Sequence, residues 1–178
     1  MLKRLRAVTL ALALSPLGAY SASNNVECPT LNVSQKAVLM KTWRYGEEKW
    51  GKGQGAKLSA VALQESELGL KIKGQGSYGI FQMKPTTAAY MEGRKDTKGV
   101  RKRLMNDFQY SAKQAHNYLA YWSDKGYSDT QVYQRYNGGY SGSKKSKHYA
   151  KQVKQKTKLL NSCYVYKDGA LHDRNKHS

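Results

Sequence analysis

The sequence LSAVALQESELGLKIKGQGSYGIFQM, residues 58–83, decides the expected fold. The apolar residues of its first half fall on one face at helical spacing: Leu58, Val61, Ala62 and Leu68. Glu65 lies on that same face. Burying an ionised carboxylate on a core face costs several kcal/mol of lost hydration. A carboxyl group in such a place therefore tends to have a raised pKa and to keep its proton. Glu65 is therefore a candidate catalytic acid, although a carboxylate at the edge of the stripe, paired with a Lys or Arg, would show the same spacing.

A glycine-rich loop follows this helix, which we expect to end at Gly69. Gly74 and Gly76 lead into the apolar run GIFQM at residues 79–83, and Pro85 is placed to begin the next helix. A small β-hairpin within residues 70–80 is the only strand structure that we expect. An acid on an apolar face, a backbone-permissive loop and a glutamine among apolar residues are together compatible with a site that cleaves sugars.

The rest of the chain is mostly helical by the same criterion of apolar spacing. We expect one helix at residues 34–50, with Ser34 as its N-cap, and another at residues 100–125. A third begins with a capping box at Ser128, and a fourth contains Tyr149, Val153 and Leu160. The helix at residues 100–125 is expected to be the longest. At 178 residues, the simplest fold is a single, mainly α domain with enough length for a core.

The charge of the chain is strongly positive, with 31 Lys and Arg against 12 Asp and Glu, or +19. Such a field favours anionic partners, which include nucleic acid, lipid headgroups and an anionic cell envelope. The 14 Tyr and 3 Trp suit base stacking or carbohydrate binding equally, so composition does not choose between these classes.

The first 23 residues predict a secretory signal. Lys3, Arg4 and Arg6 form a basic start, and the apolar core at residues 7–14 is too short to span a bilayer as a helix. The alternative is a basic or membrane-anchoring N-terminus that is not removed. We expect export to the periplasm or cell envelope, a domain at residues 24–163 and a loose basic tail at 164–178.

Cys28 and Cys163 are the only cysteines. Behind an export signal, two cysteines at the ends of a domain predict one disulfide. Closing a loop of this length stabilises a fold by roughly 4–5 kcal/mol on the chain-entropy model. The Cys and His residues show no metal-ligand spacing, so we expect neither a metal nor another cofactor.

Three short motifs occur in a fixed order: Glu65-Ser66, the GIFQM run at residues 79–83, and Tyr136-Asn137-Gly138-Gly139. Together they resemble the lytic transglycosylase domain of the goose-type-lysozyme-like superfamily, whose pattern is ES, G-[LI]-[MF]-Q-[ILM] and YNxG. Tyr149 and Val153 fit a later Tyr-x3-Val pattern in the last helix of that family. The resemblance covers residues 34–160 and implies a lysozyme-like helical domain around a substrate cleft. The short loop between Glu67 and Gly79 departs from the family pattern, which bears on specificity.

Cleavage of a glycosidic bond needs an acid that is still protonated near neutral pH. Ordinary glycosidases add a second carboxylate. Glu67 is two residues from Glu65, about 200° round a helix, and so points away. Only Glu92 or Asp96, in an expected surface loop, could approach. The pattern therefore favours a mechanism with one acid.

The resemblance supplies such a mechanism. In lytic transglycosylases, one Glu protonates the bond between N-acetylmuramic acid (MurNAc) and N-acetylglucosamine (GlcNAc). It then accepts the proton of the muramic C6 hydroxyl, which attacks the anomeric carbon to give a 1,6-anhydro product.

The family roles transfer to matching positions. They imply that Glu65 is acid and then base, that Ser66 orients it or binds substrate, that Gln82 and Met83 line the cleft, and that Tyr136 and Asn137 approach from the opposite wall. Tyr149 matches a cleft tyrosine of the family. Each residue also has a purely structural alternative: a helix hydroxyl for Ser66, core packing for Met83 and Tyr149, and a turn for Asn137.

Two other functions remain open from the sequence. One is a muramidase that uses water, and the other is a non-catalytic cationic protein that binds wall polymer, membrane or nucleic acid. For the transglycosylase, the expected partners are peptidoglycan glycan strands, with a secretion or conjugation machine or a phage assembly, including a virion, as the wider context. We expect a monomer without specific nucleic-acid binding.

Overall fold

The computed structural model describes residues 27–174. The expected signal at residues 1–23 and the last four residues of the expected tail lie outside the described residues. This part of the chain is mainly helical with one small antiparallel hairpin, which confirms the predicted fold class. The elements are α1 Val33–Trp50, α2 Gln54–Ser66, α3 Pro85–Met91, α4 Val100–Asn106, α5 Phe108–Ser123, α6 Asp129–Gly138, α7 Lys144–Cys163, β1 Tyr164–Lys167 and β2 Ala170–Asp173.

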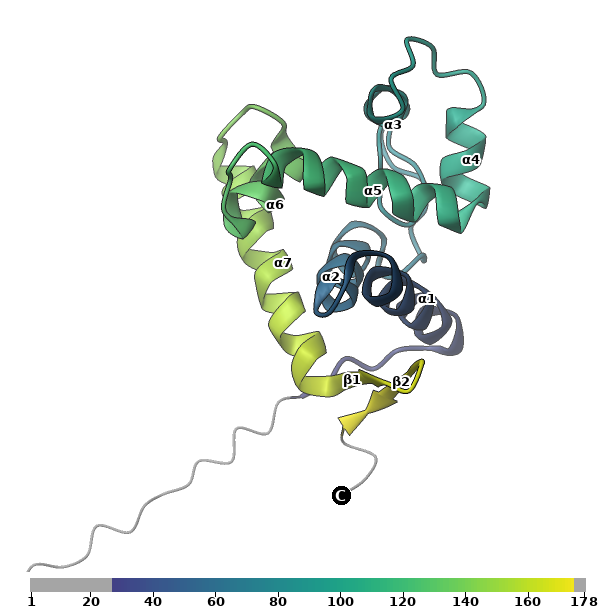
Figure 1. Cartoon of the computed structure of the whole chain (residues 1–178), viewed down its shortest axis with the longest axis vertical. Coiled ribbons are helices and arrows are strands. Elements are labelled where there is room, and N and C mark those ends of the chain that lie inside the picture. The colour runs from purple at the N-terminus through teal and green to yellow at the C-terminus, as the bar shows by residue number, and fades with distance from the viewer. Residues whose placement is uncertain (1–26, 175–178) are drawn as a thin grey trace, which may run out of the picture.

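Helix α2 lies at the centre of the molecule. It packs against α1 on one side and α7 on the other, while α5 crosses above it in the view of Figure 1. Small residues allow the close approach of α1 and α2, because a Cβ on Gly46 would lie 2.6 Å from the Cα of Gly55. Most of α2 is buried in consequence, including Leu58, Val61 and Ala62 of the predicted stripe.

The predicted disulfide is present between Cys28 and Cys163, with a Cα–Cα distance of 5.6 Å. It joins the segment before α1 to the end of α7, across a sequence separation of 135 residues. The bond therefore closes nearly the whole helical domain into one loop.

Two helix boundaries differ from the sequence-based expectation. Helix α1 begins with Asn32 as N-cap, in a capping box with Gln35, rather than with Ser34. Helix α2 ends at Ser66 instead of Gly69, because Glu67 and Leu68 take positive φ angles of 52° and 56°. The chain thus leaves the helix directly after Glu65 and its neighbour.

The single helix expected at residues 100–125 is wrong. It is two helices, α4 and α5, separated at Asp107. The Asp107 side chain accepts a hydrogen bond from the Tyr110 backbone N–H at 2.9 Å and so caps the start of α5. The apolar spacing continues across the break because both helices contribute to the same core, with Leu104 and Ala112 fully buried.

The hairpin lies at the C-terminal end and not within residues 70–80. Strands β1 and β2 pair in antiparallel register across Asp168-Gly169, whose φ angles of 53° and 76° suit a tight two-residue turn. The expectation of a loose tail is therefore wrong for residues 164–173. Residues 70–83 contain only isolated bridges, between Lys73 and Tyr78 and between Tyr78 and Met83.

Candidate active site

Glu65 lies on the last turn of α2 with its carboxyl group partly buried. Burial raises its pKa from an ordinary value of 4.5 to about 7, while a hydrogen bond from Tyr149 and the positive charge of Lys156 act in the opposite direction. Near neutral pH, both the protonated and the ionised forms of this group are therefore populated. A single side chain of this kind can both donate and accept a proton.

Tyr149 contacts the acid directly. It lies on α7, which packs against α2, and its hydroxyl donates a hydrogen bond to Glu65 Oε1 at 2.6 Å. The Tyr149 side chain is buried, and this burial raises its pKa well above the ordinary value, with the nearby Glu65 charge acting in the same direction. Tyr149 is thus a fixed neutral donor that orients the Glu65 carboxyl group.

Ser66 is fully buried, with 0% of its surface exposed, and is not among the residues that line the open space next to Glu65. Its hydroxyl donates to the Ile80 carbonyl at 2.7 Å and accepts from the Gly69 backbone N–H at 2.9 Å. These bonds join the end of α2 to the GIFQM loop. Of the two roles expected for Ser66, the geometry supports positioning of the acid and not contact with a ligand.

The GIFQM loop is held in one conformation by its own polar groups. Gln82 takes a positive φ of 45°, and its side-chain amide donates to the carbonyls of Gly79 at 2.8 Å and Lys71 at 3.1 Å. Gly79 itself has a φ of 79° and lies against the Leu104 carbonyl, where any side chain would collide. A strained backbone kept by several bonds is a common property of functional loops.

Tyr136 closes the site from α6. Its buried hydroxyl donates to the Phe81 carbonyl at 2.8 Å and lies 3.2 Å from the Met83 sulfur. Burial raises the Tyr136 pKa well above its ordinary value, and the neighbouring Glu65 charge adds to this effect. Tyr136 therefore attaches the GIFQM loop to the helix that ends at the predicted YNGG motif.

These elements surround a hollow of about 480 Å³, which we call the Glu65 hollow. The predicted site residues that line it are Glu65, Gln82, Met83, Tyr136 and Asn137. The structure thus brings together residues from three segments far apart in the sequence. Tyr149 is not among its lining residues, because it contacts the acid from below the surface.

The Glu65 hollow also has lining residues that the sequence analysis missed. Lys84, the N-cap of α3, and Lys145, in the first turn of α7, both line it. The other lining residues are Ser77, Thr87, Tyr118, Gly138, Gly139, Ser141 and Ser143. Lysines are so common in this chain that no sequence signal singled these two out.

Glu65 is the only carboxylate among the described residues that line this hollow. The two loop acids considered as partners lie elsewhere. Glu92 accepts hydrogen bonds from Tyr110 at 3.1 Å and Gln114 at 3.2 Å, and Asp96 pairs with Arg94 at 2.7 Å. Within residues 27–174, the hollow therefore offers one acid and no second carboxylate.

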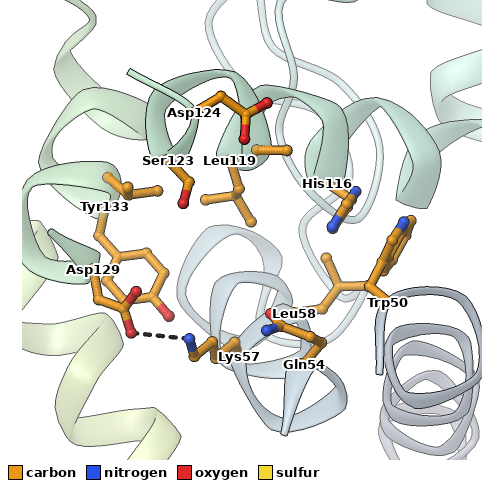
Figure 2. A pocket seen from close by; sticks show the side chains of 12 residues that line it. Trp50, Gln54, Lys57, Leu58, His116, Leu119, Ser123, Asp124, Asp129 and Tyr133 are labelled. Carbon is orange, nitrogen blue, oxygen red and sulfur yellow. Dashed lines mark ion pairs between the residues drawn. The ribbon is translucent and has the colours of Figure 1, made fainter. Parts of the chain in front are cut away.

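A separate hollow of about 340 Å³ lies at the other end of α2, between α1, α5 and α6 (Figure 2). His116 stacks on Trp50 with ring centroids 3.6 Å apart, and burial lowers the pKa of His116 to about 4. Lys57 pairs with Asp129 at 2.9 Å across the same hollow. None of the predicted site residues lines it.

No family model, curated protein or solved structure matches this chain. Residues 27–174 contain no cluster of three or more His, Cys, Asp or Glu arranged to hold a metal ion. In the same part of the chain, no helix combines the length and the apolar character needed to cross a bilayer. The functional assignment therefore depends on the Glu65 hollow and its chemistry.

Proposed function

We propose that this protein is a lytic transglycosylase that cleaves the β-1,4 bond between MurNAc and GlcNAc in peptidoglycan and leaves a 1,6-anhydro-MurNAc end. The observation that carries the proposal is Glu65, a lone carboxyl group with a pKa of about 7 that lines an open hollow. The order of the ES, GIFQM and YNGG motifs supports the same assignment.

The first half of the reaction needs the protonated form of Glu65. Its proton passes to the oxygen of the glycosidic bond, the bond to the anomeric carbon breaks, and the GlcNAc side leaves as an alcohol. Partial burial keeps this proton in place near neutral pH, because the charged form is poorly hydrated.

The second half needs the carboxylate. It accepts the proton of the muramic C6 hydroxyl while that oxygen forms a new bond to the anomeric carbon, which closes the anhydro ring without water. The hydrogen bond from Tyr149 at 2.6 Å stabilises the carboxylate at this stage. Asn137 lines the hollow and carries an amide of the kind that binds the hydroxyl and acetamido groups of sugars. Gln82 also lines the hollow, but its amide N–H groups hold the loop through the Gly79 and Lys71 carbonyls.

Hydrolysis by the same acid is the second candidate, because water could replace the C6 hydroxyl as nucleophile. A hydrolase commonly uses a further carboxylate to activate that water. No such group lines the Glu65 hollow within residues 27–174, and this favours the intramolecular reaction.

The remaining parts of the proposal concern context. A chain with a net charge of +19 is suited to an anionic envelope, and the expected export signal would deliver it there. We place the protein in the periplasm or cell envelope, or on a virion, as a monomer that opens the wall locally for a secretion or conjugation machine or for a phage.

The direct test compares the wild type with Glu65→Gln in solubilising purified sacculi. The matched control is Glu67→Gln, which makes the same chemical change two residues away at an exposed side chain paired with Lys71. We expect Glu65→Gln to lose activity by about a thousandfold or more, since general acid and base steps are both removed, and Glu67→Gln to retain it. Equal activity of Glu65→Gln and the wild type would contradict the enzymatic proposal and favour a cationic wall binder.

A further inference from the structure

A second hollow of about 280 Å³ adjoins the Glu65 hollow. The two share the lining residues Thr87, Tyr118 and Gly139. It extends from there between α3, α5 and the turn that follows α6. We call it the tyrosine hollow, after its lining residues Tyr90, Tyr118, Tyr121 and Tyr140.

None of the described residues that line the tyrosine hollow carries a charge. Its side-chain polar groups are the hydroxyls of the four tyrosines and of Thr86 and Thr87, together with the indole N–H of Trp122. The chain has 31 Lys and Arg, and the adjoining Glu65 hollow has Lys84 and Lys145 in its lining. An uncharged, hydroxyl-rich hollow on so basic a protein suits a neutral ligand rather than an anionic one.

Two tyrosine rings in this hollow are exposed to solvent. Tyr140 is 71% exposed and Tyr90 is 63% exposed. An exposed aromatic ring that adjoins a hollow marks a surface able to cover an apolar ligand face. The phenol hydroxyl at its edge can bond to a polar group of the same ligand.

The exposed ring of Tyr140 is held in place before any ligand arrives. Its hydroxyl lies 3.2 Å from that of Tyr121, and its ring meets Trp122 edge-on at 4.9 Å between centroids. Arg135 donates to the Tyr140 carbonyl at 2.6 Å and so fixes the backbone of the turn. Because the Tyr140 ring is already ordered, the protein loses little conformational entropy when a ligand covers it.

We propose that the tyrosine hollow is a saccharide subsite that takes a GlcNAc ring of a glycan strand whose cleaved bond lies at Glu65. A pyranose ring has an apolar face for Tyr90 and Tyr140 and polar edges for the surrounding hydroxyls. GlcNAc is uncharged, whereas MurNAc carries a lactyl group that ends in a carboxylate or a peptide. The lysines of the Glu65 hollow suit the muramic residue, and the uncharged tyrosine hollow suits its neighbour.

This inference rests on the proposed function, because it assigns the ligand by continuity with the Glu65 hollow. Its consequence is separate from catalysis. A glycan long enough to reach both hollows gains affinity from Tyr90 and Tyr140, even when the acid is disabled.

The experiment measures the binding of a GlcNAc hexamer to Glu65→Gln protein by isothermal titration calorimetry. The same measurement is made with Tyr90→Ala and Tyr140→Ala added together, and with Tyr166→Ala added as the control. Tyr166 belongs to β1. Figure 1 shows β1 at the other end of the molecule from α3. We expect the double change to weaken binding by about tenfold, as for the loss of two aromatic contacts, and the control change to leave it unaltered.

Both exposed tyrosines pack little against the core, so the variants should fold, and equal thermal midpoints check this. The proposal is overturned if the double variant binds the hexamer as tightly as the Glu65→Gln parent, or if the parent does not bind the hexamer. The sacculus assay fails or succeeds independently. If the protein cleaves sacculi but its binding of the hexamer does not depend on Tyr90 and Tyr140, only the subsite proposal is contradicted. If binding depends on these tyrosines but sacculi are not cleaved, only the proposed reaction is contradicted.

Discussion

Replacing Glu65 with Gln should stabilise the folded protein, and the gain should grow with pH. Burial raises the pKa of this carboxyl group from 4.5 to about 7. Between these two values the folded state keeps a proton that the unfolded chain has lost, so the stability of the wild type falls as pH rises. The difference of about 2.5 between the pKa values corresponds to about 3 kcal/mol above pH 7, at 1.36 kcal/mol for each unit of pH.

Gln carries no charge at any pH and can still accept the hydrogen bond from Tyr149. The free energies of unfolding of the two proteins should therefore be nearly equal at pH 4 and differ by about 3 kcal/mol at pH 8. Urea denaturation followed by circular dichroism at several pH values, with the disulfide intact, measures this difference. Glu67→Gln is the control, since an exposed acid should give a small difference that hardly changes with pH.

A difference between wild type and Glu65→Gln that stays flat from pH 4 to pH 8 would contradict a raised pKa for the Glu65 carboxyl group. A Glu65→Gln variant that becomes the less stable protein as pH rises would contradict it equally. Either result would mean that the carboxyl group is well hydrated, or paired with a cation, in the folded state. The acid would then be ionised near neutral pH and unsuited to donate a proton.

Three further predictions concern the Glu65 carboxyl group, its hydrogen bond with Tyr149 and the disulfide. The kcat/KM for glycan cleavage should fall as pH rises through about 7, because Glu65 loses its proton there, and a pH–rate profile checks this. Tyr149→Phe removes a hydrogen bond that lowers the Glu65 pKa. The alkaline limb of the pH–rate profile should therefore move to higher pH, and kcat should fall. A limb that does not move would contradict the contact between Tyr149 and Glu65. Reducing the Cys28–Cys163 bond should lower the free energy of unfolding by roughly 4–5 kcal/mol, measured by urea denaturation with and without reductant, and a loss below about 1 kcal/mol would contradict its role in closing the chain.

Much of the fold was predictable because apolar spacing is a local property of the sequence. The stripe containing Leu58 and Val61 predicted the buried helix that carries Glu65, and Pro85 predicted the start of α3. The cysteine pairing was predictable from chain position and the expected export. These features depend on near neighbours or on a single pair of residues, so no three-dimensional packing had to be known.

Some features had a local signal that the sequence analysis did not use. Asp168-Gly169 between alternating residues is a strong indication of a hairpin, and the structure has one there. Asn32 and Gln35 match a capping box as well as any Ser-based one. Asp107 is a suitable N-cap inside the apolar pattern, but continuous spacing concealed the break that it makes.

Other features of the site have no local signal. The hydrogen bond between Tyr149 and Glu65 joins residues that are 84 positions apart, and it depends on how α7 packs against α2. Lys84 and Lys145 enter the Glu65 hollow only because the fold brings the starts of α3 and α7 to its edge. The family pattern placed Ser66 beside the acid, but only the structure shows that its hydroxyl faces the Ile80 carbonyl.

The most direct test is mass spectrometry of the muropeptides released from sacculi by the purified protein in water enriched with oxygen-18. Our account predicts 1,6-anhydro-MurNAc ends that carry no oxygen-18, and no products from Glu65→Gln. Reducing MurNAc ends that carry oxygen-18 would contradict the intramolecular reaction. Anhydro products from Glu65→Gln would contradict the role of that acid altogether.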